Sequence, residues 1–88
     1  MPYIKPEQRQ FATVTLKDVG ELNYTISVLC HNYISKRGGG TRYQYINDVI
    51  GALECAKLEL YRTVAADYED IKRKENGSVS TLDEVKNA

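Results

Sequence analysis

The sequence predicts a mainly α fold: an antiparallel helical hairpin with an extended or short β N-terminal arm, assembled into a homo-oligomer. Three observations predict it, namely two segments with a 3.6-residue apolar period, three glycines between them, and a length of 88 residues. A chain of this length buries only about two-thirds of its unfolded surface, so assembly is the usual way to bury more. The single domain 1–88 divides into an arm at 1–17, a helical hairpin at 18–77 and a tail at 78–88.

The N-terminal arm begins polar and becomes apolar. Residues 1–10 contain two prolines, which favour an extended or loosely attached segment. Residues 11–16 alternate apolar residues with threonine, as a short strand does. A single strand has no partner, so we expect this segment to pair with another copy or with the tail near Ser78 and Val79, or to lie extended across the helices.

The first helix is expected from Gly20 to about Ser35. Asp18 and Glu21 have capping-box spacing at its start. Apolar residues then follow a helical period: Val19, Leu22, Ile26, Leu29, Cys30 and Tyr33. The glycines at 38–40 end this pattern.

The second helix is expected from about residue 42 to 74, with Thr41 and Gln44 as a second capping box. Its apolar stripe consists of Ile46, Val49, Ile50, Leu53, Ala56, Leu60 and Val64. The helix either runs to Lys74 or breaks near residues 65–67, and Gly77 supplies a left-handed stop in both cases. The spacing of Thr81 and Glu84 indicates one last short helical turn.

Charge and cysteine content exclude several classes of function. Twelve basic and twelve acidic residues give a net charge of zero, which disfavours nucleic acid as a partner, and no apolar run suits a membrane. Cys30 and Cys55 are interpreted as reduced thiols in a cytoplasmic protein, and His31 has no second histidine for a zinc site. No catalytic triad, Cys-His pair or carboxylate pair is recognisable, so we expect neither an enzyme nor a cofactor.

Several longer motifs carry a family resemblance. They are Met1-Pro-Tyr-Ile4, Gly20-Glu-Leu-Asn-Tyr24, the run from Tyr45 to Arg62, Tyr68-Glu-Asp70 and Glu75-Asn-Gly77. In these the chain resembles a family of short uncharacterised proteins of phages and bacteria, which implies a small phage-type helical protein in the cytoplasm of a bacterial host.

The chain departs from this family pattern at two positions. Asp67 stands where the family has a proline, which leaves a continuous second helix possible. Thr63 follows Arg62 where a second arginine is usual, which weakens the argument for a paired-arginine site.

The loop between the helices is the candidate site for a small anion. Glycines let backbone amides face a ligand, and the following helix N-terminus adds about half a positive charge. Basic side chains flank the glycines, and a tyrosine beside them is suited to stack on a base. The predicted ligand-binding residues are Arg37, Gly38, Gly39, Gly40, Thr41, Arg42, Tyr43 and Lys57. The alternative is a plain linker, because the Lys-Ser/Thr pair of a Walker motif is missing.

Lys57 places an ammonium in the middle of the second apolar stripe. One interpretation is a snorkelling or internally paired lysine, with Glu54, Glu21 or Asn23 as the partner. The other is a lysine that contacts a ligand or another subunit.

A second face of each helix predicts assembly. Gly51, Leu58 and Ala65 recur every seven residues, and we call them the seven-residue seam. Tyr24 and Val28 form a comparable patch on the first helix. A hairpin covers one stripe of each helix and not two, so these surplus faces favour homo-oligomerisation, the alternative being that the N-terminal arm covers them.

Together these features predict a non-enzymatic phage-type protein whose oligomer binds a small anionic ligand between subunits. The expected ligand is a cyclic nucleotide or ADP-ribose-type signal of a host defence system, which the protein would sequester. The alternative is a protein–protein interaction module or inhibitor that acts on a host protein through the seven-residue seam and binds no small ligand.

Overall fold

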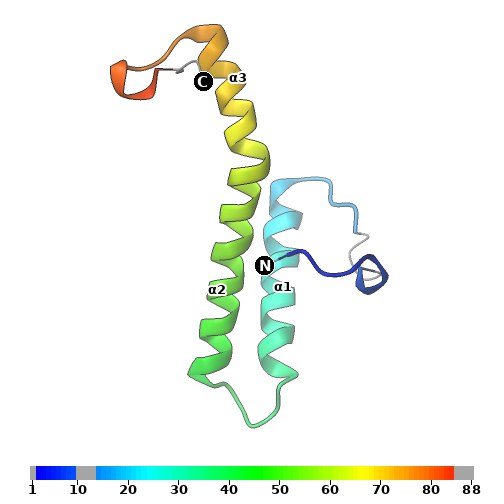
Figure 1. Ribbon diagram of the computed structural model, residues 1–88. Coiled ribbons are helices and arrows are strands. Elements are labelled where there is room, and N and C mark those ends of the chain that lie inside the picture. Colours follow the sequence, from blue (N-terminus) through cyan, green and yellow to red (C-terminus); the bar gives the residue numbers. More distant parts are fainter. Residues whose placement is uncertain (1, 10–13, 85–88) are drawn as a thin grey trace. The chain divides into compact units, whose positions relative to one another are not determined.

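The computed structural model describes residues 2–9 and 14–84, which are mainly helical and contain no strand (Figure 1). The elements are a 3-10 turn Pro6–Gln8, helix α1 Val19–Ser35, helix α2 Tyr43–Leu60, a π-helical turn Tyr61–Ala65, helix α3 Ala66–Asn76 and a 3-10 turn Thr81–Asp83. The contacts divide the chain into two units, Met1–Cys55 and Ala56–Ala88.

Helix α1 confirms the first predicted helix to within one residue. Asp18 is its N-cap in extended conformation, and its Oδ1 accepts a hydrogen bond from the backbone N–H of Glu21 at 2.8 Å. The return bond of the predicted capping box is displaced, because the Glu21 carboxylate accepts from the N–H of Lys17 at 3.2 Å and not from that of Asp18. The polar start of α1 is therefore fixed on both sides of the cap.

The loop after α1 reverses the chain through Gly38, Gly39 and Gly40, whose φ angles are 77°, 71° and 80°. Residues other than glycine rarely adopt a positive φ, and three of them in succession are rarer still. Helix α2 begins at Tyr43, and the carbonyl of Arg42 accepts the N–H groups of residues 45 and 46 at 3.1 and 3.2 Å. The helix thus starts at Tyr43, one residue later than the predicted start at residue 42. In the first unit α1 and the start of α2 lie side by side and antiparallel (Figure 1).

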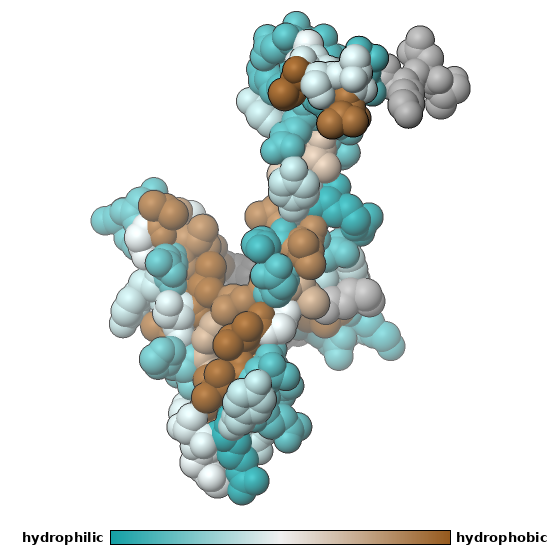
Figure 2. Space-filling view, turned by 90° about the vertical axis from the view of Figure 1, so that its left-hand side faces the viewer, coloured by the Kyte–Doolittle hydropathy of each residue, from teal (hydrophilic) through white to brown (hydrophobic). Residues whose placement is uncertain are grey.

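This hairpin covers its apolar side chains less well than the sequence predicts. None of the described residues is buried. Even on the predicted inner stripes Ile26, Leu53 and Leu22 remain 37, 43 and 46% exposed. Apolar side chains consequently gather on the surface, where they form a continuous patch on the face shown in Figure 2. A pair of helices leaves part of each apolar stripe in water, and this hairpin is such a pair.

The second predicted helix does not break near residues 65–67. Leu60, Ala65 and Ala66 all have right-handed helical backbone angles, so the chain stays helical through the π-helical turn into α3. The hydroxyl of Tyr61 donates a hydrogen bond to the Glu69 carboxylate at 2.8 Å. This bond connects the first residue of the π-helical turn with α3. The sequence period gave no sign of this turn.

Helix α3 ends at the predicted glycine, but not in the predicted conformation. Gly77 has φ 91° and ψ 158°, a region open essentially to glycine alone and distinct from the left-handed helical one. Its N–H donates to the carbonyl of Arg73 at 2.9 Å. The predicted short turn in the tail is confirmed as Thr81–Asp83.

The N-terminal arm contains a turn that the sequence reading missed. Pro6–Gln8 form a 3-10 turn, and the guanidinium of Arg9 donates to the carbonyl of Ile4 at 2.7 and 3.0 Å. Residues 14–16 are irregular and form no strand, so of the two predicted forms of this segment only the extended one remains for them, and residues 11–13 lie outside the described part of the chain. Within that part, no helix has the length and apolar character that a bilayer crossing requires.

The end of α3 gives a first test of the fold. We expect Gly77→Ala to lower the free energy of unfolding by about 1 to 3 kcal/mol, because alanine is strained at this φ and ψ. Asn76→Ala, one residue earlier in helical conformation, is the matched control and should change stability by less than about 0.5 kcal/mol. Urea unfolding followed by circular dichroism at one protein concentration measures both, and equal stabilities would contradict this position for the helix end.

Candidate functional site

Two arginines of the predicted site are fixed against the loop by local contacts. The guanidinium of Arg42 lies over Gly39, where an added Cβ would be 3.1 Å from Nη2. The guanidinium of Arg37 stacks on the ring of Tyr33 at 3.8 Å from its centroid, a cation–π geometry. No acidic residue occurs between Glu21 and Asp48, whereas Lys36, Arg37 and Arg42 all lie in that interval. We call residues 36–43 the basic loop.

A hollow lies where α1, the basic loop and α2 meet. It has a volume of about 480 Å³ and is lined by His31, Ile34, Ser35, Thr41 and Ile46, and we call it the junction hollow. Ile34 and Ile46 form its apolar walls, and both side chains are half-buried. Thr41 is the one predicted ligand-binding residue in this lining, so the hollow extends the predicted site toward α1.

A second hollow lies on α1 alone, with a volume of about 300 Å³. Its lining is Tyr24, Ser27, Val28, His31 and Asn32. Tyr24 and Val28 therefore lie together on one face of α1, as the sequence predicts for its surplus patch. His31 borders both hollows, which gives this single histidine a place between an apolar patch and the basic loop.

The other predicted residues are less closely grouped. Tyr43 is 81% exposed at the start of α2, and Lys57, also exposed, lies in the second unit, so the structure does not place it with the loop. In the seven-residue seam, Leu58 is 55% exposed and a Cβ added at Gly51 meets open space. Ala65 falls at the end of the π-helical turn, so the regular seven-residue spacing of the seam holds only up to Leu58.

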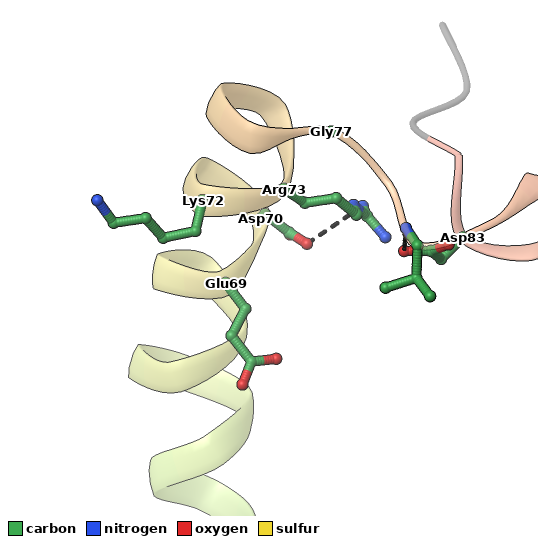
Figure 3. A pocket seen from close by; sticks show the side chains of 7 residues that line it. Glu69, Asp70, Lys72, Arg73, Gly77 and Asp83 are labelled. Carbon is green, nitrogen blue, oxygen red and sulfur yellow. Dashed lines mark hydrogen bonds and ion pairs between the residues drawn. The ribbon is translucent and has the colours of Figure 1, made fainter.

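The segment that follows α3 contains the predicted short turn and forms a further hollow, which the sequence analysis did not predict. Gly77 to Glu84, which we call the C-terminal turn, folds back beside the last turns of α3 (Figure 3). Arg73 extends from α3 toward Asp83 and forms an ion pair with Asp70 at 3.3 Å (Figure 3). The hollow between them, about 370 Å³, is lined by Glu69, Asp70, Lys72, Arg73, Gly77, Val79 and Asp83.

Asp83 holds the C-terminal turn together. Its carboxylate accepts the backbone N–H of Ser80 at 2.8 Å and that of Val79 at 3.0 Å. These two bonds, in that order, are the main cause of the lowered pKa of Asp83, and the charge of Arg73 adds to them. The capping box consists of Ser80 and Asp83, one residue earlier than the Thr81 and Glu84 spacing from which the turn was predicted.

The described residues offer little for covalent or metal chemistry. They contain no group of three His, Cys, Asp or Glu side chains that would hold a metal ion. Cys30 is half-buried and Cys55 exposed, and both are free thiols. What the geometry provides is a basic loop, three open hollows and a set of exposed apolar faces.

These features define a small helical hairpin protein with a cluster of three basic side chains at the reversal of the chain. Within that class, the chain belongs to the family described as Domain of unknown function (DUF6899), whose model matches residues 1–79. No curated protein and no solved structure matches the chain.

The pKa of Asp83 makes the C-terminal turn sensitive to acid. Because folding lowers this pKa, the carboxylate stabilises the turn above its ordinary value of 3.8, and this contribution is lost as the pH falls through the folded-state value. We expect the amide resonances of Val79 and Ser80 to move together in an acid titration by NMR. In Asp83→Asn the joint transition should be absent, and its persistence there would assign it to another group.

Proposed function

We propose that this chain is a non-enzymatic, self-associating helical protein that binds a small anionic ligand at the basic loop. The observation that carries the proposal is the loop, in which three successive glycines with positive φ lie between two exposed arginines. Glycine leaves backbone N–H groups open to a ligand, and the N-terminus of α2 adds positive potential. Arginine is suited to bind phosphate oxygens in pairs.

The ligand class we propose is a nucleotide. Its phosphate would lie against the amides of residues 38–41 and the guanidinium groups of Arg37 and Arg42, and Tyr43, at 81% exposure, is available to stack on the base. A cyclic nucleotide or ADP-ribose-type signal fits this description, and a phage-type protein that sequesters such a signal would weaken a host defence system. The resemblance to phage proteins in the sequence supports this role.

Self-association is supported by the lack of buried side chains among the described residues. Helices of this length are marginal in water without tertiary packing. Leu58, Leu60 and Val64 are 55, 63 and 58% exposed, and water-exposed apolar groups of this extent favour contact with another protein surface. A second copy of the chain is the simplest such surface.

A second candidate function uses the same apolar faces. The chain would then be an interaction module or inhibitor that binds a host protein and no small ligand. The exposure of Tyr24 and Leu58, 72 and 55%, favours this alternative, because neither belongs to the basic loop. The two functions differ in whether any nucleotide stabilises the purified protein.

Thermal shift with nucleotides tests the ligand. A nucleotide at a hundredfold excess over its Kd should stabilise the fold by about 2.7 kcal/mol. We expect a shift with at least one member of a panel of cyclic dinucleotides and cyclic ADP-ribose isomers, and we expect Arg42→Glu to abolish it. Arg9→Glu makes the same charge change in the N-terminal arm and should retain the shift. If no nucleotide of the panel has an effect and the protein captures one host protein, the ligand-binding function is wrong and the interaction module takes its place.

Sedimentation velocity tests self-association. At micromolar concentration the wild-type chain should sediment as more than one copy, and Leu58→Glu should produce a monomer or an insoluble chain, because a carboxylate in an apolar contact is costly. Asp48→Asn, an exposed position on the same helix that lies about 80° around the helix axis from Leu58, alters charge outside the seam and serves as the control. A monomeric wild-type chain would contradict this part of the proposal.

A further inference from the structure

We propose that copies of this chain associate head to tail, with the C-terminal turn of one copy docked on the junction hollow of the next. The inference rests on the self-association proposed above and does not require the nucleotide. It assigns one contact surface to the C-terminal turn and a different one to the junction hollow, and it names a second copy as the occupant of both.

The C-terminal turn is held in place by hydrogen bonds among its own residues. Besides the two bonds to the Asp83 carboxylate, the hydroxyl of Ser78 donates to the carbonyl of Asp83 at 3.0 Å. The N–H of Leu82 donates to the hydroxyl of Ser80 at 3.1 Å. A segment ordered by its own hydrogen bonds loses little conformational freedom when it docks, and this pre-organisation favours binding.

What the turn presents is apolar. Val79 and Leu82 are 96 and 95% exposed, more than any other large apolar side chain among the described residues. The large apolar side chains of the helices are exposed by 81% or less, since each lies partly on its own helix. The turn therefore displays two apolar side chains almost wholly in water, a costly arrangement unless another surface covers them.

The junction hollow is suited to receive such side chains. Ile34 and Ile46 form its apolar walls, and its other lining side chains can donate hydrogen bonds from an imidazole or hydroxyl. It is open to solvent and has a volume of about 480 Å³. An apolar hollow with a polar rim is the usual complement of a small apolar anchor.

Charge complementarity identifies the occupant as a second copy. The junction hollow adjoins the basic loop, with three basic residues and no acidic one between Glu21 and Asp48. The segment from residue 69 to 84 has five acidic and three basic residues, so it carries a net charge of two minus. Asp83 and Glu84 are adjacent to the apolar pair, which would bring them toward Lys36 and Arg37 of the next copy. Such pairing favours the correct register and accelerates association.

A contact between two different surfaces is heterologous and repeats from copy to copy. It closes into a ring if the rotation permits and otherwise continues as a filament. The basic loop then lies next to a subunit boundary, where a ligand would touch two copies.

The first experiment removes the apolar anchor. We expect Leu82→Ser to weaken self-association in sedimentation velocity by about tenfold or more, because the contact loses the burial of one leucine side chain. Val19→Ser, in a side chain that is 79% exposed and outside both surfaces, is the matched control and should leave association unchanged. If the wild type associates and Leu82→Ser matches it, the head-to-tail contact is wrong while self-association stands. A monomeric wild type would overturn both.

The second experiment exchanges charges across the contact. Glu84→Lys and Lys36→Glu should each weaken association by about threefold or more through like-charge repulsion, and the double variant should recover most of the loss. Both side chains are exposed, so neither change should impair the helices. Additive losses in the double variant would overturn the pairing. If the charge effects do not depend on protein concentration, the contact lies within one chain, and the head-to-tail contact between copies is wrong.

Discussion

The extent of apolar surface on the helices is the constraint on which this structure depends. A hairpin of two helices covers a narrow strip of each, and here even the innermost leucines and isoleucines stay partly in water. The loop, the hollows beside it and the apolar pair on the C-terminal turn all matter because the chain by itself leaves this surface uncovered. Under the proposed self-association, fold and assembly would therefore depend on the same apolar surface, as they do in many chains of this size.

The basic loop combines two demands on the same residues. The chain needs glycine at residues 38–40 to reverse direction, and the same lack of side chains leaves backbone N–H groups accessible beside Arg37 and Arg42. The model of the DUF6899 family matches residues 1–79, so the reversal and both helices of the hairpin lie inside the matched region. The C-terminal turn lies mostly beyond it, since Asp83 and Leu82 follow its last residue.

Local signals of the sequence predicted most of the fold, because caps and glycines act over a few residues. Asp18 and Gly77 mark a helix start and a helix end where the structure has them. The π-helical turn was not predicted, because a single wider turn inside a continuous helix leaves no period of its own in the sequence. Of the site, the arginines and glycines of the loop were predicted, whereas the contribution of His31 and Ile34 depends on how α1 packs beside α2.

The lack of buried side chains among the described residues bears on how the proposed self-association would respond to protein concentration. In a monomer with a closed core, dilution leaves the native state unaltered, because every stabilising contact is internal. For a chain whose apolar faces are covered only by other copies, stability cannot be separated from the amount of protein present. Dilution would then act on it as urea acts on an ordinary domain, loosening the helices themselves, and backbone amides of α1 and α2 would exchange with solvent faster as the copies separate.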